Sequence, residues 1–217
     1  MSKPIDQFWS IRLQQVAEAL EKNNFAVHLA ETADEAKNLV LDTIIPQVQA
    51  KSVSFGGSST VVDSGLFDAL KERDDLDVLD TYTRGGSTEE FLERRRQALL
   101  TDLFITGTNA LTESGQLVNL DGTGNRVAAL AYGPRHCVIL VGRNKIVAGL
   151  EEAIDRVKMF AAPVNAMRLN RKTPCVKTGY CMDCSSPDRI CSMWSIHEKS
   201  SPKQRIHVVL INQDLGF

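Results

Sequence analysis

The chain has 217 residues, of which 43% are hydrophobic in type, and this is enough to bury the core of one α/β domain, with or without a small appendage. Its 25 basic and 27 acidic residues give a formal net charge of -2, which excludes nucleic-acid binding driven by bulk positive charge. No apolar run is long enough to span a membrane, and the amphipathic N-terminal stretch lacks the apolar core of a signal peptide. We therefore expect a cytoplasmic protein with no nucleic-acid partner and no membrane partner.

Helical and strand patterns alternate along the first half of the chain. Leu13, Val16 and Leu20 recur at helical spacing, and Thr32 with Glu35 has the pattern of a capping box that opens a second helix. A proline cannot continue the hydrogen-bonded ladder of a helix, so that helix is expected to end at its proline. The expected elements are helices over 4–23, 33–46, 61–70 and 88–100 and strands over 25–29, 52–55 and 77–79, with Pro46 ending the second helix.

The second half of the chain continues the alternation and then loses it. Cys137–Val141 is the clearest buried strand, and the segment 168–205 has little periodicity before a last strand over 207–211. The other expected elements are strands over 103–106 and 117–120 and helices over 127–130 and 150–157. Near-continuous apolar strands that alternate with helices predict a mainly parallel sheet covered on both faces. We expect one domain over 1–217, with 168–205 as an insertion or subdomain before the last strand.

A glycine-rich and hydroxyl-rich loop follows the strand over 52–55. Glycines let a ligand approach the backbone, and the N-terminus of the following helix favours negative charge. The loop has neither the dinucleotide-binding nor the P-loop pattern. The sequence therefore indicates an anion or ligand site here, and a tight turn with ordinary Ser/Thr capping is the alternative. The candidate binding residues of this loop are Gly56, Gly57, Ser58, Ser59 and Thr60.

Polar residues also follow three later strands. Ligands of open α/β sheets bind outside the carboxyl ends of the strands, so these loops are candidate walls of one pocket, and the cations after Val141 suit an anionic substrate. Taken singly, each loop is also explained by ordinary turn chemistry. The candidate residues are Thr106, Gly107, Thr108 and Asn109, then Asn119, Asp121, Gly122, Gly124, Asn125 and Arg126, and finally Arg143 and Lys145.

Four of the five cysteines lie close together near the C-terminus. Cys175, Cys181, Cys184 and Cys191 fall within 17 residues, whereas Cys137 belongs to a buried strand. In a reducing compartment such a cluster predicts a metal site, because four thiolates are the ligand set of tetrahedral zinc or of an iron–sulfur cluster. The spacing matches no standard ferredoxin run, and two disulfides or unligated thiols are the alternative.

Four blocks of the chain resemble the LUD domain family, the lactate utilization proteins of the LutC/YkgG type. The blocks are residues 54–60, 104–110, 115–127 and 141–146, and the cysteine-bearing tail resembles one branch of that family. The resemblance implies a three-layer α/β/α sandwich with a Rossmann-like sheet, similar to sugar-phosphate isomerases and CoA transferases. It also implies a role in oxidising L-lactate to pyruvate beside other lactate-utilization subunits. No catalytic residue carries over from the family.

Two functional hypotheses follow. The first is a redox component whose pocket binds a small anionic 2-hydroxy or 2-oxo acid and whose four cysteines hold an iron–sulfur cluster. The second is a non-redox binding protein, or an isomerase- or transferase-like enzyme, with a structural zinc at the same cysteines. An assembly scaffold with a vestigial pocket is a third, and a homodimer is among the assemblies we expect. Iron with acid-labile sulfide would distinguish the first hypothesis from the second.

Overall fold

The computed structural model describes residues 4–83 and 86–217, and residues 1–3 and 84–85 of the expected domain lie outside that part. Its centre is a six-stranded sheet in which every neighbouring pair of strands is parallel. The order across the sheet is β1-β10-β7-β4-β2-β3. The bounds are β1 Ala26–Ala30, β2 Ser52–Phe55, β3 Asp77–Leu79, β4 Leu103–Gly107, β7 His136–Gly142 and β10 Ile206–Ile211.

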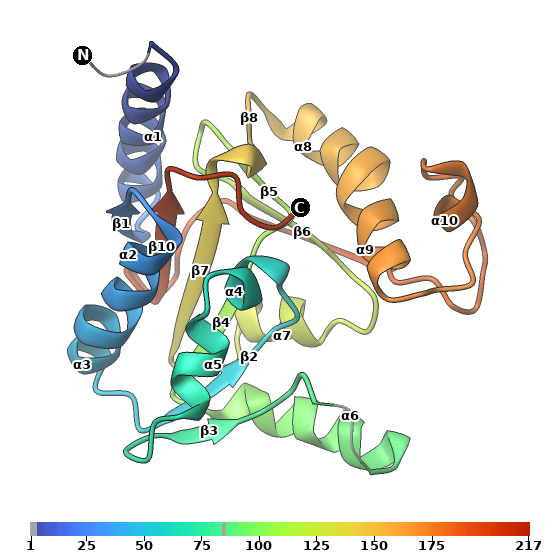
Figure 1. Ribbon diagram of the computed structural model, residues 1–217, viewed down its shortest axis with the longest axis horizontal. Coiled ribbons are helices and arrows are strands. Elements are labelled where there is room, and N and C mark those ends of the chain that lie inside the picture. The colour runs from blue at the N-terminus through green and yellow to red at the C-terminus, as the bar shows by residue number, and fades with distance from the viewer. Residues whose placement is uncertain (1–3, 84–85) are drawn as a thin grey trace.

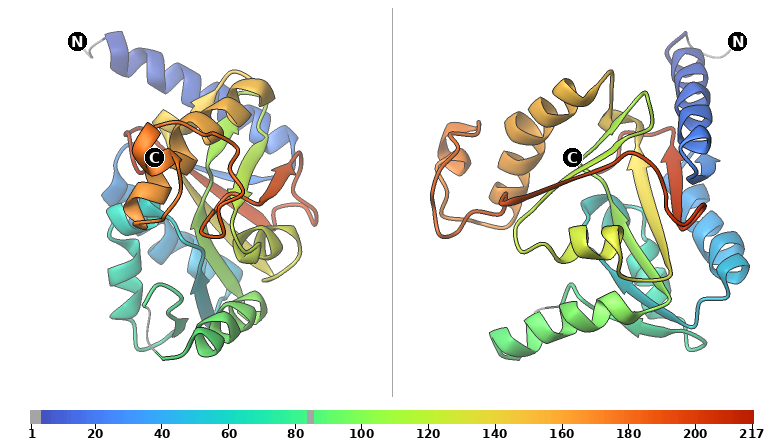
Figure 2. Two further views of the ribbon diagram at one scale, coloured as in Figure 1. Left: turned by 90° about the vertical axis from the view of Figure 1, so that its right-hand side faces the viewer. Right: turned by 180° about the vertical axis from the view of Figure 1, so that it is seen from behind.

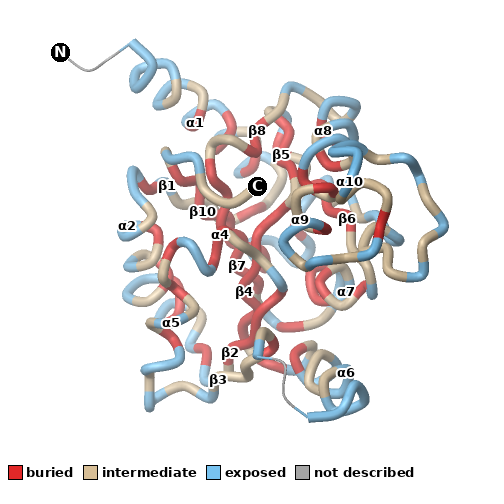
Figure 3. Tube along the Cα trace, turned by 45° about the vertical axis from the view of Figure 1, so that its right-hand side comes forward, coloured by how far each residue is buried: buried red, intermediate tan, exposed pale blue. Residues whose placement is uncertain are grey.

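Alternate side chains of the central strands point to opposite faces of the sheet and belong to two separate apolar cores. In β7, Cys137 and Ile139 belong to one core, and Val138 and Leu140 belong to the other. This follows from the two-residue period of a strand, and it explains why the central strands are apolar at most positions on both faces. Figure 3 shows the resulting unbroken buried trace along β4 and β7.

Helices cover both faces of this sheet, which confirms the expected three-layer α/β/α architecture (Figure 1). One core receives α1 and α7, and the other receives the helices from α2 to α5. The helix α6 and the short η2 turn precede β4 at the edge that holds β2 and β3. The bounds are α1 Pro4–Lys22, α2 Ala33–Asn38, η1 Leu39–Ile44, α3 Ile45–Val48, α4 Ser59–Asp63, α5 Leu66–Lys71, α6 Thr88–Gln97, η2 Ala98–Leu100 and α7 Asn125–Ala131.

A second, smaller sheet was not expected from the sequence. Its order is β8-β5-β6-β9, with β6 antiparallel to both neighbours, and a third apolar cluster joins it to α8 and η4. The strand β9 arises inside the segment expected to be irregular. The bounds are β5 Ala110–Thr112, β6 Leu117–Asp121, β8 Ile146–Val147, β9 Met193–His197, η3 Arg143–Lys145, α8 Leu150–Arg156, η4 Val157–Ala161, α9 Ala162–Arg168 and α10 Cys175–Thr178.

The expectation that Pro46 ends its helix is wrong. Helical structure continues without a break from Ala33 to Val48 and ends at Gln49, whose φ of 52° is left-handed. Directly before Pro46 the chain is a π-helix, in which the turn is wider than in an α-helix. This change of hydrogen-bond pattern leaves room for the proline ring and makes its missing N–H harmless.

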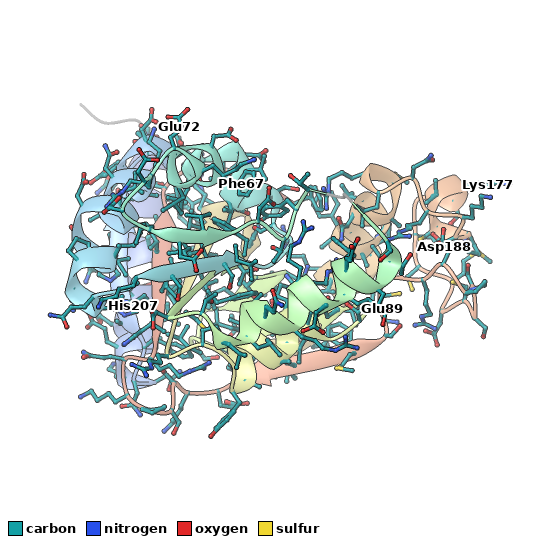
Figure 4. All side chains as sticks on the ribbon, turned by 90° about the horizontal axis from the view of Figure 1, so that it is seen from below. Phe67, Glu72, Glu89, Lys177, Asp188 and His207 are labelled. Atoms are coloured by element: carbon teal, nitrogen blue, oxygen red, sulfur yellow. The ribbon has the colours of Figure 1, made fainter. Side chains whose placement is uncertain are left out.

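Residues 168–191 of the cysteine-rich segment 168–205 lie with α8 and α9 on the side of the molecule away from α1–α3 (Figures 1 and 2). The end of the segment returns to the C-terminus of α1, where the N–H groups of Ser200 and Gln204 donate to the carbonyls of Asn23 and Asn24. Figure 4 shows Lys177 and Asp188 of this segment at the end opposite His207 of β10. Most of its residues between α10 and β9 are half-buried or exposed. None of the helices in the described part of the chain is long and apolar enough to cross a membrane.

Candidate functional site

A cavity of about 250 Å³ opens where the loops after β2, β4 and β6 meet. The first loop precedes α4, the second connects β4 to β5, and the third connects β6 to α7. The expected binding residues that line this cavity are Gly57, Ser58, Ser59, Gly107, Thr108, Asn109, Asp121, Gly122, Asn125, Arg126 and Lys145. The structure therefore brings all three expected loops to one place, although β6 belongs to the second sheet.

The loop before α4 is shaped by Tyr82. Its hydroxyl donates to the carbonyl of Gly56 at 2.9 Å and accepts from the N–H of Ser58 at 3.2 Å. Ser58 in turn caps α4, because its Oγ accepts from the N–H of Val61 at 3.4 Å. The buried hydroxyl of Ser59 has no hydrogen-bond partner. Ser59 lines the cavity, and its buried hydroxyl is the one of this loop to which the described residues offer no hydrogen-bond partner.

Close packing holds the second loop against the first. A Cβ atom added at Gly107 would lie 2.5 Å from Ser58 Oγ, so only glycine allows these two loops to touch. Beyond it, the Thr108 hydroxyl donates to the carbonyls of Ala110 and Val118 at 3.0 and 3.1 Å. The single proton of the Thr108 hydroxyl is thus engaged within the second sheet, while the Thr108 carbonyl accepts from Lys145.

Arg126 of α7 is a buried cation held by neutral partners. Its Nη2 donates to Asn109 Oδ1 at 2.8 Å and to the Leu120 carbonyl at 3.0 Å. Asp121 contacts the backbone of the same turn, with one oxygen 3.0 Å from the N–H of Gly122 and the other 3.0 Å from the N–H of Arg126. Burial lowers the pKa of the Arg126 guanidinium, and the negative charge of Asp121 only partly offsets that effect.

Lys145 is the most deeply buried cation of the cavity, with 3% of its surface exposed. Its Nζ donates to Thr60 Oγ1 at 2.6 Å and to the Thr108 carbonyl at 3.2 Å. Burial, followed by the positive charges of Arg156 and Arg126, lowers the pKa of Lys145 to about 7. An amine with such a pKa is one of the features that mark functional sites.

The remaining expected residues do not line the cavity. Arg143 forms an ion pair with Asp214 at 3.0 Å and lies over the Trp9 ring. Thr60 reaches the site through its bond to Lys145. Asn119 is fully buried, and both polar atoms of its amide have no partner. The others are Gly56, Thr106 and Gly124.

Several lining residues were missed by the sequence analysis. Arg168 and Leu169 lie at the end of α9, and Arg171 and Ile190 belong to the cysteine-rich segment. None of them follows a strand of the main sheet, so the strand-end rule could not find them. The helix that packs on the second sheet is α8, and α9 continues from it through η4, which carries the end of α9 to the cavity. The other missed lining residues are Phe55, Thr81, Tyr82, Phe91, Arg95, Leu120, Thr123, Asn165 and Phe217.

The four clustered cysteines line a second cavity of about 20 Å³. All four are half-buried and none is in a disulfide, and the wall between them is largely apolar, with Ala162, Pro163, Ala166, Met182 and Ile190. Ile190 also lines the first cavity, so the two cavities share a wall. Cys137 is buried in β7 and belongs to neither.

Hydrogen bonds fix the loop that carries these cysteines. Arg189 donates to the carbonyls of Cys184 and Cys191 at 2.6 and 2.7 Å. The N–H of Asp183 donates to Cys181 Sγ at 3.4 Å, a type of contact that tunes thiolate ligands of iron–sulfur clusters. Hydrogen bonds from the neighbouring residues Arg189 and Asp183 therefore hold the backbone around these cysteines in place.

The four thiols match both expected cofactors in number but not in arrangement. Within residues 4–83 and 86–217, no three His, Cys, Asp or Glu side chains are close enough to hold one metal ion. The cavity between Cys175, Cys181, Cys184 and Cys191 is about 20 Å³, which is room for about one water molecule. A tetrahedral zinc would therefore require the four thiols to move together, and a cubane cluster, which is larger than one ion, would require them to move apart.

Comparison with known proteins identifies similar molecules. The family described as LUD domain matches residues 13–211. A solved structure of a DUF162 family protein from Deinococcus radiodurans is similar over 94% of this chain and 98% of its own length, with a TM-score of 0.56 and 14% sequence identity. At that identity the likeness concerns the fold. A comparison with curated proteins gave no match.

Proposed function

The chain belongs to the LUD domain family, and on that premise we propose that it binds a small anionic 2-hydroxy or 2-oxo acid as one component of an L-lactate to pyruvate oxidation system. The observation that carries the proposal is the cavity at the three polar loops. Its described lining includes Arg126, Lys145 and Arg168 but only one acidic side chain, Asp121. Such a lining attracts a negatively charged ligand more strongly than a neutral one, and it repels a cationic one.

The residues of the cavity suit the two functional groups of such an acid. Lys145 and Arg126 offer cationic donors for a carboxylate, and the unpartnered Ser59 hydroxyl can bond to the oxygen on the second carbon. The apolar side chains of Phe55 and Leu120 supply the rest of the wall. These residues bind and orient the acid, and Lys145 is the group whose pKa permits it to take up or release a proton.

The cysteine-rich segment supplies the redox part of the proposal. Oxidation of L-lactate to pyruvate releases two electrons and two protons, and an iron–sulfur cluster passes electrons one at a time to a partner. Cys175, Cys181, Cys184 and Cys191 would hold the cluster, and Ile190 would separate it from the acid. Other lactate-utilization subunits are the proposed partners. Zinc at the same cysteines remains the second candidate, in which case the protein is a non-redox binding protein or an isomerase- or transferase-like enzyme.

Metal analysis after anaerobic purification tests the cofactor part of the proposal. We expect iron and acid-labile sulfide in equal amounts, with visible absorbance that is lost in the Cys181→Ser variant. The matched control is Cys137→Ala, which removes a thiol of β7 that lies outside both cavities. Colourless protein with one zinc per chain would select the second candidate. Full metal content in all four single Cys→Ser variants would contradict both.

A further inference from the structure

Charge around the first cavity is far out of balance. The side chains lining it include five cations, Arg95, Arg126, Lys145, Arg168 and Arg171, against the single carboxylate of Asp121. Two of the five are engaged elsewhere, since Arg171 forms an ion pair with Asp188 at 3.1 Å and Arg95 donates to Thr123. The excess positive charge that a ligand can meet therefore comes from Lys145, Arg126 and Arg168.

These three cations are held by neutral groups. Lys145 donates to a hydroxyl and a carbonyl, Arg126 to an amide oxygen and a carbonyl, and Arg168 to the amide oxygen of Asn165. None of the ion pairs found among residues 4–83 and 86–217 includes any of the three. The carboxylate of Asp121 bonds to backbone N–H groups instead. Among the described residues, therefore, no side-chain carboxylate forms an ion pair with these three cations, and Asp121 and Asp63 act on Arg126 and Lys145 only at longer range.

A further cation lies directly behind the cavity. The Arg156 guanidinium donates to the Asn109 carbonyl at 2.6 Å, and it too is absent from the ion pairs. Burying a cation without a counter-ion is unfavourable unless a ligand supplies the missing charge. One carboxylate can neutralise one of these cations, so a monoanion such as L-lactate would leave the site positively charged.

The cations also lie at two depths. Lys145 and Arg126 are buried beside the loops of the main and second sheets, whereas Arg168 is exposed at the end of α9 and contacts the Phe217 ring. We propose that the ligand of this cavity is a 2-hydroxy or 2-oxo acid that carries a second anionic group, a carboxylate or a phosphate ester. The inner group bonds to Lys145, and the outer group bonds to Arg168. This inference rests on the part of the proposed function that assigns the cavity a small 2-hydroxy or 2-oxo acid, and it departs from L-lactate and pyruvate themselves, because each of these carries a single carboxylate.

Two matched pairs of acids test it by isothermal titration below neutral pH. L-Malate differs from L-lactate by an added carboxylate, and 3-phosphoglycerate differs from glycerate by a phosphate on the third carbon, so all four acids keep a free 2-hydroxyl. We expect each acid with the second anionic group to bind at least about tenfold more tightly than its monoanionic counterpart. The tighter of these two acids identifies the second group. If L-lactate binds as tightly as L-malate, and glycerate as tightly as 3-phosphoglycerate, the inference is overturned and the proposed function stands. If none of the four binds, both are overturned.

Substitutions of Arg168 and Lys145 test which cation binds which anionic group of the ligand. Arg168→Gln should weaken the binding of L-malate or 3-phosphoglycerate about tenfold while changing that of L-lactate or glycerate little, because only the acids with a second anionic group reach the outer position. Arg168 is exposed, so this variant is expected to fold even if a buried substitution does not. Lys145→Met should weaken all four acids. Lys37→Met, which removes a surface cation paired with Asp34, is the control and should change none. An equal effect of Arg168→Gln on both members of each pair, or no effect on either, contradicts the two-group arrangement.

Discussion

The Lys145 amine makes the stability of the protein depend on pH. Its folded-state pKa of about 7 lies below its usual value of 10.5, so between these two values the unfolded chain binds more protons than the folded one. Stability contributed by this group therefore rises as the pH increases through that window, and below pH 7 the folded protein bears the full penalty of a buried charge. The groups that act on it are Arg156, Arg126 and Asp63.

Lys145→Met should remove that penalty. We expect the variant to be more stable than the wild type below pH 7, by roughly 1–4 kcal/mol, since a methionine of similar length needs no counter-ion. The difference should shrink as the pH rises toward 10.5, the usual value for a lysine. Urea denaturation across this range measures it, with Lys37→Met as the surface control. A variant less stable than the wild type at low pH would show that the amine contributes more through its bonds to Thr60 and Thr108 than its burial costs.

The affinity for anions should depend on pH in the opposite sense. A negatively charged ligand favours the protonated amine, so binding is strongest below the free protein's pKa of about 7 and weakens as the pH rises above it. Titrating one acid across that range in buffers of different ionisation enthalpy also gives the proton uptake. Affinity that does not change with pH, or no proton uptake above neutral pH, would mean that another cation, such as Arg126, binds the negatively charged group of the ligand.

Gly57 offers a way to block the cavity without disturbing the fold. It is exposed at the cavity wall, and a Cβ atom added there would meet no other atom within 4 Å. Gly57→Val should therefore fold normally and lower the affinity for every acid by crowding the approach to the loop. Thermal denaturation and titration of the same sample check both parts. Gly107→Ala is the contrasting variant, because its Cβ would collide with Ser58 and displace the loop itself.

At the scale of elements, the loop between β6 and α7 couples the two cavities. A Cβ atom added at Gly122 would lie 3.2 Å from the backbone of Ile190, the residue that lines both. Gly122→Val should therefore push the cysteine-rich segment outward. We expect weaker acid binding together with lower metal content in this one variant. Loss of only one property would show that the cavities, although adjacent, act independently.

At the scale of the whole molecule, the cysteine-rich segment differs from the rest of the chain in how it is stabilised. Its residues between α10 and β9 are half-buried or exposed, whereas the central strands lie in two apolar cores. A bound metal centre would supply the folding energy that the segment lacks. Chelation should therefore increase hydrogen exchange over residues 172–195 and leave β4, β7 and β10 protected. Equal exchange with and without metal would indicate that the segment folds on its own.

Local pattern was sufficient to predict the architecture of this protein. The runs at β4, β7 and β10 are apolar at most positions because both faces of each strand are buried, and that pattern is typical of a covered parallel sheet. The helix spacing of Leu13, Val16 and Leu20 likewise predicted the buried face of α1. Residue identity and spacing were enough in these cases, because one hydrophobic period determines one element.

The second sheet and the outer wall of the cavity were decided by tertiary structure. The short strands β5 and β8 have too few residues to show a period, and β9 alternates weakly within a polar segment. Arg168 and Ile190 reach the cavity because α8 packs on that sheet and the chain after it folds back toward the loops, which lie roughly 40 residues or more earlier in the sequence. Nothing in the sequence around Lys145 distinguishes it from a surface lysine. Only burial among Thr60, Thr108 and two arginines shifts its pKa, because the energy of a charge depends on its surroundings.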